Sequence, residues 1–230
     1  NGTLEFEGEY LNGTRWNGKG KEFHYDDKLK FEGEYIKGEK RGKEYDYNGN
    51  LKYEGEYLNG KKHGEGKEYY DNGKIEFEGE YLYGRKWTGK GYNIYNEIIY
   101  ELKKGNGYVK EYNAKNKLIF EGEYLNGLRH GKCKEYSNDW DNKLEFEGEY
   151  LYGKKNGKGK VHYSDYYKGE YYNDQKHGKG KEYYNNGNLK FEGEYYNDVK
   201  HGKGKEYFNN GNIKFEGEYF YGMKWTGQGY

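Results

Sequence analysis

The chain has no proline, a single cysteine, no long apolar run and no net charge. The lone Cys133 excludes an internal disulfide framework. No apolar run approaches the roughly 20 residues that a membrane-spanning helix needs. The 40 lysines and arginines are balanced by 40 acidic residues. This balance disfavours nucleic-acid binding, which depends on an excess of positive charge. It also gives no support to electrostatic membrane association, although such association stays possible.

Glycine and tyrosine are abundant instead, with 39 and 33 copies. A mean hydropathy of -1.51 and a hydrophobic content of 32% are values that lean toward disorder. Aromatic residues, however, make up 20% of the chain, whereas disordered segments are poor in them. The glycines also fall at fixed places in a recurring pattern, so we expect an ordered fold in which they are structural.

One five-residue motif, Phe-Glu-Gly-Glu-Tyr, organises the chain. Its copies are spaced by 21 to 26 residues, with one gap of 43 residues that has room for a degenerate copy. A fixed period of this length is typical of repeat proteins, and it predicts about ten repeats here. Seven identical copies begin at Phe6, Phe31, Phe77, Phe120, Phe146, Phe191 and Phe215, and two variant copies begin at Tyr53 and Tyr167.

The repeat that spans residues 51–73 shows the expected local structure. Aromatic residues and glycine alternate with glutamate, which is the period of a β-strand with one aromatic and one acidic face. Asn59-Gly60 follows, and Asn-Gly between two alternating segments predicts a type I′ hairpin turn. We therefore predict an all-β fold in which stacked β-hairpins form one elongated, twisted antiparallel meander sheet, curled into a trough.

A two-residue turn also predicts the register of the hairpin. Gly55 should face Gly64, and Tyr53 should face Gly66, so that the tyrosine ring covers the bare glycine backbone. The opposite face should carry stripes of glutamate that alternate with stripes of lysine. The residues assigned to the turns and the aromatic face are Asn59, Gly60, Tyr53, Gly55, Gly64, Gly66, Phe77, Gly79, Phe120, Gly122, Phe191 and Gly193.

These residues resemble a known family. The stretch FEGEYYNDVKHGKG at residues 191–204 looks like the MORN repeat, and residues 183–195 are similar to its microbial variant form. The resemblance extends over nearly the whole chain. It implies hairpins stacked in a long antiparallel sheet and a scaffold or adaptor role, often with self-association through the ends of the array. Some members are linked to membranes or phospholipids, and some carry the array beside a catalytic domain.

The stretch 93–113 breaks the pattern. It is unusually aliphatic, and Leu102 stands where glycine is expected, two residues after Tyr100. We expect either a degenerate repeat that kinks the array, or a boundary or contact site that uses Tyr100 and Leu102. The chain is thus divided into hairpin arrays at 1–92 and 114–230, with 93–113 between them.

Two sets of aromatic residues are candidates for interaction. One set stands, with one extra residue, where other repeats have histidine, and it either pads a β-bulge or forms an exposed anchor. The other set replaces asparagine at hairpin turns, where an exposed ring could stack on a ligand. The two sets are Trp16, Trp87 and Trp225, and Tyr83, Tyr152 and Tyr221.

No constellation for catalysis or metal binding emerges. Histidine recurs at one repeat position, but equivalent residues of adjacent hairpins lie about 9.5 Å apart, too far to share a zinc ion. The carboxylates are periodic and matched by lysines. The two serines, Ser137 and Ser164, lie in no nucleophile motif. We predict a protein that is not an enzyme and that uses no metal and no cofactor.

Two functions remain. The first is a structural scaffold that binds proteins, above all other copies of itself through the open sheet ends. The second is a ligand-binding module in which exposed tyrosine and tryptophan stack on a glycan, a lipid headgroup or a membrane surface. The sequence leaves the compartment open. Because it begins without methionine and stops within a repeat, we expect a segment of a longer array.

Overall fold

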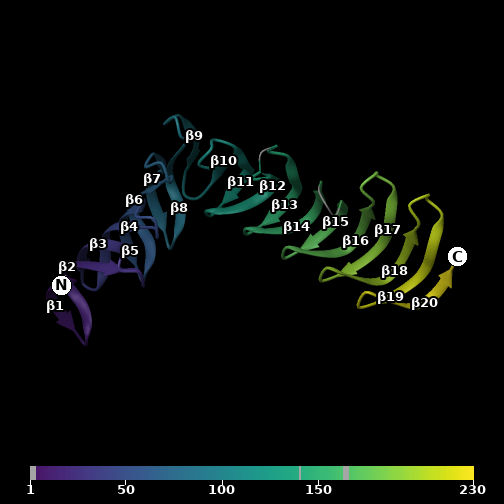
Figure 1. Cartoon of the computed structure of the whole chain (residues 1–230), viewed down its shortest axis with the longest axis horizontal. Coiled ribbons are helices and arrows are strands. Elements are labelled where there is room, and N and C mark those ends of the chain that lie inside the picture. The colour runs from purple at the N-terminus through teal and green to yellow at the C-terminus, as the bar shows by residue number, and fades with distance from the viewer. Residues whose placement is uncertain (1–3, 140, 163–165) are drawn as a thin grey trace. The chain divides into compact units, whose positions relative to one another are not determined.

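The structure is a computed structural model that describes residues 4–139, 141–162 and 166–230. Within these ranges every regular element is a β-strand, and the twenty strands form nine regular antiparallel hairpins and one irregular hairpin, whose strands at 98–102 and 107–112 are joined by an isolated bridge (Figure 1). The all-β fold, the hairpin repeat and the number of repeats predicted from the sequence are confirmed.

The strands form two sheets, and in each sheet they follow the order of the chain. The first sheet contains β1 (Phe6–Leu11), β2 (Thr14–Phe23), β3 (Leu29–Ile36), β4 (Glu39–Tyr45), β5 (Leu51–Leu58), β6 (Lys61–Tyr69), β7 (Ile75–Leu82), β8 (Arg85–Tyr92) and β9 (Ile98–Leu102). The second sheet contains β10 (Gly107–Tyr112), β11 (Leu118–Leu125), β12 (Leu128–Tyr136), β13 (Leu144–Leu151), β14 (Lys154–Val161), β15 (Tyr167–Tyr172), β16 (Gln175–Tyr183), β17 (Leu189–Tyr196), β18 (Val199–Tyr207), β19 (Ile213–Phe220) and β20 (Met223–Gly229).

The expectation of one continuous sheet is therefore corrected to two. The break falls between β9 and β10, inside the irregular stretch 93–113. These two strands have only five and six residues, and an isolated bridge from Lys103 to Asn106 joins them. By contacts the chain divides into two compact units. The first spans residues 1–118 with 124–128, and the second spans residues 119–123 with 129–230.

The hairpin turns have the predicted backbone conformation. Asn59 and Gly60 have φ angles of 51° and 70°, so both central residues are left-handed, as a type I′ turn requires. Tyr83, Tyr152 and Tyr221 adopt similar positive angles at their own turns. The left-handed region is costly for a tyrosine, and the following glycine completes each of these turns.

The predicted register holds near the turn and fails beyond it. Tyr57 lies opposite Lys62 as expected, but Gly55 lies opposite Gly66 and not opposite Gly64. A β-bulge at Gly64, whose φ is 63°, causes the shift. The first glycine of the Gly-x-Gly motif thus makes the bulge, and the second glycine continues the ladder. Strand β4 has a single glycine and pairs with β3 without a shift.

The ring–glycine contact predicted from the sequence is nevertheless present. Tyr53 lies opposite Glu68, and its ring leans diagonally across Gly66. Two ring atoms of Tyr53 lie 2.7 Å from the position that a Cβ atom on Gly66 would occupy. The same glycine position recurs strand after strand, and the paired glycines form a row across each sheet.

The core is a continuous file of aromatic rings on one face of each sheet. The first aromatic residues of the internal repeats, among them Tyr53, Phe77, Phe120 and Phe191, are fully buried. Phe77 packs edge-to-face on Tyr81 of its own strand, with ring centroids 5.4 Å apart. Tyr81 also packs on Tyr53 of the preceding repeat, at 5.3 Å. Each repeat therefore buries its rings against its neighbour, and such edge-to-face pairs contribute about 0.5–1.5 kcal/mol beyond area burial.

The ring–glycine contact yields a stability prediction. Gly66→Ala places a methyl group against the buried Tyr53 ring, so we expect the free energy of unfolding to fall by about 1–3 kcal/mol. Gly229→Ala is the control, because Gly229 is likewise the second glycine of its Gly-x-Gly motif and the nearest atom would lie 4.0 Å from the new Cβ. Urea unfolding measures both variants, and equal losses would contradict the role given to the ring.

Candidate functional site

The three candidate tryptophans, Trp16, Trp87 and Trp225, lie at β-bulges. In β2 the pairing skips Trp16, and in β8 it skips Trp87. Both side chains are half-buried, because the turn of the next hairpin lies over them. The backbone N–H of Gly38 donates to the carbonyl of Trp16 at 2.9 Å, and Gly105 does the same for Trp87 at 2.6 Å. These two residues are packing elements.

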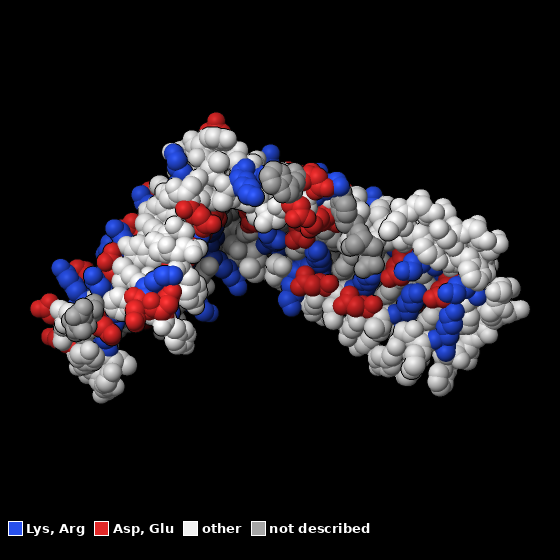
Figure 2. Space-filling model, in the orientation of Figure 1, with Lys and Arg blue, Asp and Glu red and all other residues white. Residues whose placement is uncertain are grey.

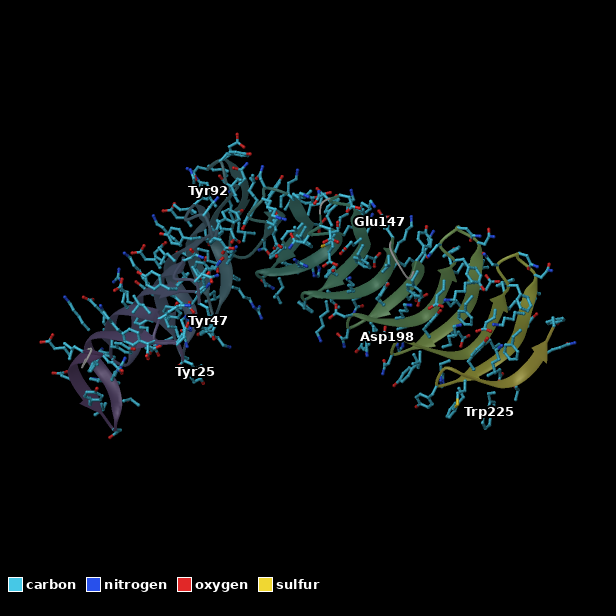
Figure 3. The ribbon with its side chains drawn as sticks, viewed as in Figure 1. Tyr25, Tyr47, Tyr92, Glu147, Asp198 and Trp225 are labelled. Atoms are coloured by element: carbon cyan, nitrogen blue, oxygen red, sulfur yellow. The ribbon has the colours of Figure 1, made fainter. Side chains whose placement is uncertain are left out.

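Trp225 in β20 differs from its two equivalents. It also occupies a bulge, but no hairpin covers it, and 70% of the residue is exposed. Its side chain projects away from the ribbon (Figure 3). Of Trp16, Trp87 and Trp225, Trp225 is thus the one that is exposed enough to be an interaction anchor.

Tyr10 in β1 is exposed in a similar way. Its equivalent in the next repeat, Tyr35, is 5% exposed because the ring packs on Phe6 of the preceding repeat at 5.5 Å. Among the residues that the structure describes, no other strand pairs with the outer edge of β1, and Tyr10 is 61% exposed. The outer edges of β1 and β20 therefore each carry an exposed aromatic side chain, whereas the equivalent side chains inside the array are covered.

The turn tyrosines are also exposed, as the ligand-binding hypothesis requires. Tyr83, Tyr152 and Tyr221 each contact the recurring histidine of the preceding return strand, with ring centroids 5.0 to 6.0 Å apart. In the second compact unit further rings join them. Successive centroids lie 5.4 to 5.8 Å apart along a file that consists of Tyr172, His177, Tyr196, His201, Phe220 and Trp225, here called the aromatic ladder.

Tyr100 and Leu102 do not form the contact site proposed for them. They are 8% and 2% exposed and belong to a buried cluster with Phe77 and Val109. The ring of Tyr100 stacks on Phe77 at 6.3 Å. Leu102 lies opposite Gly89 in the ladder, so the aliphatic residues of stretch 93–113 replace part of the aromatic core.

Sequence reasoning missed a set of ion pairs on the aromatic face. Glu68 alternates with Lys67 along β6, so it lies on the aromatic face, where it is directly opposite Tyr53 and Phe77. Its carboxylate pairs with Lys62 at 2.6 Å and with Lys86 at 2.9 Å. The ammonium of Lys62 also lies 4.6 Å from the centroid of the Tyr53 ring.

The same arrangement recurs around Glu135, Glu182 and Glu206. Lysine and arginine side chains thus cover the outer faces of the rings, and the glutamates between them form ion pairs with these side chains. This layer of ion pairs over the aromatic face is here called the roof. The signal was in the sequence, as the Lys-Glu-Tyr that follows the Gly-x-Gly motif. Alternation along the strand already places this glutamate on the aromatic face, and the bulge decides only which residue lies opposite it.

The roof shifts the pKa values of its members. Burial opposes the ionised form of Glu68, but the attraction of Lys86 and Lys62 is stronger and lowers the pKa of Glu68 to about 2. Burial raises the pKa of Tyr57, and a hydrogen bond that its hydroxyl donates to Glu44, 2.7 Å long, adds to the shift. These groups keep one charge state at neutral pH, as expected of structural and not catalytic positions.

Each compact unit has a groove over the charged face of its sheet. The second-unit groove has a volume of about 1190 Å³ and is lined by the glycine row, seven lysines and five glutamates of β13–β19. The first-unit groove has about 470 Å³ and is lined by three lysines and five glutamates. Figure 2 shows the lysines and glutamates of the second unit between margins of uncharged residues.

Residues of catalytic or metal-binding type are dispersed. Cys133 is buried, its thiol donates to the carbonyl of His130 at 3.4 Å, and burial raises its pKa to about 11. Ser137 bonds within its own turn, and Ser164 lies outside the described residues. Over the described ranges no cluster of three metal-ligating side chains occurs. No helix long and apolar enough to span a membrane occurs there either.

The hairpin with its left-handed turn, glycine row and aromatic file defines the chain as a β-hairpin repeat protein. A family profile described as the MORN repeat matches residues 53–75, 120–142, 146–166, 167–189 and 191–213, and the MORN repeat variant matches 39–59. The chain therefore belongs to the MORN-repeat family. MORN repeats are typical of proteins that mediate protein or membrane association, and they are generally structural or binding and not catalytic. No curated protein matches the chain.

The roof over the rings predicts how stability changes in acid. The pKa of Glu68 is lower in the folded chain than its ordinary value of 4.5, so its stabilisation is present above pH 4.5 and is lost as the pH falls toward 2. Glu68→Gln should flatten the pH dependence in this window. It should also lower the free energy of unfolding at pH 7 by about 2 kcal/mol.

Glu65→Gln on β6 is the control for this prediction. Glu65 is exposed and lies opposite Glu80, so its loss should change stability by no more than about 0.5 kcal/mol. Urea unfolding between pH 2 and pH 7 compares the two variants with the parent chain. An unchanged acid limb in Glu68→Gln would show that other carboxylates control acid unfolding.

Proposed function

We propose that the chain is a non-catalytic scaffold that associates with proteins, and foremost with other copies of itself in a head-to-tail manner. The proposal is supported by the MORN-repeat family, whose members typically mediate protein or membrane association, and by the exposure of Tyr10 and Trp225 on the outer edges of β1 and β20 in this chain. The lack of catalytic activity remains a prediction, supported by the generally structural nature of the family.

The junction between β2 and β3 is the template for the contact. There Gly18 lies opposite Tyr35, and Gly20 lies opposite Gly33. The turn of the second hairpin covers Trp16 and donates a backbone hydrogen bond to its carbonyl. The Tyr35 ring fills the space beside Phe6. Backbone pairing and ring packing together join the first hairpin to the second at this junction.

The same geometry can form between β20 of one copy and β1 of another. Gly227 would lie opposite Tyr10 of the second copy, and Gly229 would lie opposite Gly8. The turn at Gly13 would cover Trp225, and the Tyr10 ring would pack beside Phe215. Unpaired strand edges accept such additions, and a heterologous contact of this kind can continue into filaments.

Complementary variants test this mode of assembly. Tyr10→Lys removes the ring on one edge, and Trp225→Lys removes the ring on the other; both residues are exposed, so the fold should persist. The parent chain should gain mass with concentration in light scattering after size exclusion, whereas each variant alone should stay at the 27.4 kDa of a single chain. An equimolar mixture should form a two-chain species, because each variant retains one intact edge.

Tyr25→Lys is the matched control, because Tyr25 is a fully exposed turn residue, and this variant should assemble like the parent. A parent chain that stays monomeric at all concentrations would rule the proposal out. Mass growth that the two edge variants do not change, or variants that fail to complement each other, would place the contact elsewhere.

The aromatic ladder favours a second candidate function. Its tyrosines, Phe220 and Trp225 are exposed at hairpin tips, and flat exposed rings in a file suit stacking on sugars or lipid headgroups. Tyr196→Ser should then weaken binding of a soluble oligosaccharide at least about tenfold, as expected of an aromatic anchor, while Tyr25→Ser should not. Tryptophan fluorescence during titration measures the affinity, and equal effects of the two variants would argue against the ladder.

A further inference from the structure

The charged face of the array follows a strict cross-strand pattern. On the row beside the glycines, the first strand of a hairpin carries glutamate and the return strand carries lysine. Glu32 lies between Lys21 and Lys43, and Glu192 lies between Lys181 and Lys205. Opposite charges that face each other stabilise neighbouring strands, so each lysine of the row normally has an acidic neighbour on both sides.

Strand β15 breaks this pattern. Lys168 occupies the position at which the other copies of the motif carry glutamate. It lies directly opposite Lys160 on β14 and directly opposite Lys181 on β16. Three ammonium groups thus come from consecutive strands, and like charges at such positions destabilise a sheet. The fold by itself gives no reason for this arrangement.

The nearby carboxylates compensate only the outer members of this lysine row. Lys181 pairs with Glu192 at 2.8 Å, and Lys160 lies 3.9 Å from Glu147. Lys168 is exposed, and within the described ranges no carboxylate forms an ion pair with it. Glu170, on the same strand, turns toward the bulge at Gly178 and does not line the groove. The centre of the row therefore carries uncompensated positive charge.

Lys160, Lys168 and Lys181 line the second-unit groove, so their charge is recessed and still accessible to solvent. Gly159, Gly169 and Gly180 pair in register beside the three lysines, and their backbone lines the groove, whereas a Cβ on any of them would point to the rings on the opposite face. The lining of the second-unit groove has more lysines than glutamates, and that of the first-unit groove has more glutamates than lysines. An anion would accordingly be drawn to the second groove and not to the first.

We propose that Lys160, Lys168 and Lys181 form a binding site for the dianion of a soluble phosphate monoester. Neighbouring strands lie about 4.8 Å apart, so the flexible lysine side chains from three consecutive strands can converge on one phosphoryl group. Lysine binds phosphate as a point charge, and a dianion offsets the repulsion within the row. The site lies in the groove between its margins, which favours a soluble ligand over the headgroup of a flat bilayer.

Binding is tested with the whole chain and with phenyl phosphate as the probe, by calorimetry at low ionic strength. Lys168→Gln should weaken binding at least tenfold. Lys67→Gln is the matched control, because Lys67 has the same place in a row but pairs with Glu78 at 2.9 Å, and its loss should leave the affinity unchanged. Equal weakening by both variants would show general electrostatic attraction and would overturn the proposal.

Lys168→Glu separates the site from the fold. It restores the alternation of the row, so the variant should unfold at a higher temperature than the parent while it loses phenyl phosphate binding. Conversely, Glu32→Lys places three lysines in one row of the first-unit groove, and it should add a second phosphate site to the chain.

Vesicles distinguish the source of the phosphoryl group. The parent chain should bind phenyl phosphate and should show no Lys168-dependent binding to vesicles that contain phosphatidic acid. Binding to these vesicles without binding to phenyl phosphate would overturn the soluble-ligand proposal in favour of a membrane. Binding to neither probe would overturn the site altogether. Because assembly depends on the edges of β1 and β20, none of these outcomes bears on the proposed scaffold function.

Discussion

The contact of an aromatic ring with a bare glycine backbone is the interaction on which the rest of the structure depends. Tyr53 can lie across Gly66 because Gly66 has no side chain. The Tyr53 ring then packs against Tyr81 of the next repeat. The contact recurs along the array, for example at Gly159, Gly180 and Gly204, so a sheet only one layer thick still has a continuous core. A hairpin alone would leave its rings in water, which makes every repeat dependent on its neighbours.

The roof of ion pairs follows from this core. A ring on a single-layer sheet has one face open to solvent, and the aliphatic part of a lysine side chain such as Lys62 covers it. The ammonium then lies where it can pair with Glu68, whose ionised form is strongly favoured as a result. The chain thus closes its core with charged residues, which agrees with its low hydropathy and its zero net charge.

Because the repeat is so regular, a residue that departs from it stands out and needs a separate explanation. Where the repeat is regular, a lysine has glutamates on both sides and each turn covers the bulge of the preceding hairpin. Lys168 departs from the first rule, and Trp225 departs from the second. The proposed functions rest on these departures, since a residue that follows the pattern is already explained by the stability of the array. Leu102 and Val109 of the stretch 93–113 depart as well, but they fill the core, so a departure points to function only when it is exposed.

The sequence by itself determined the all-β class, the ten hairpins, the Asn-Gly turns and the aromatic face, because these depend on local signals that recur in every repeat. It also indicated that tryptophan pads a bulge. Only the tertiary structure decided the register beyond the turn, since the bulge at Gly64 shifts the pairing so that Glu68, and not Gly66, lies opposite Tyr53. It likewise decided that Tyr100 and Leu102 are buried and that Lys168 lies between two lysines. Local signals cannot decide these points, because side-chain direction alternates along a strand and one bulge changes the partner of every residue after it.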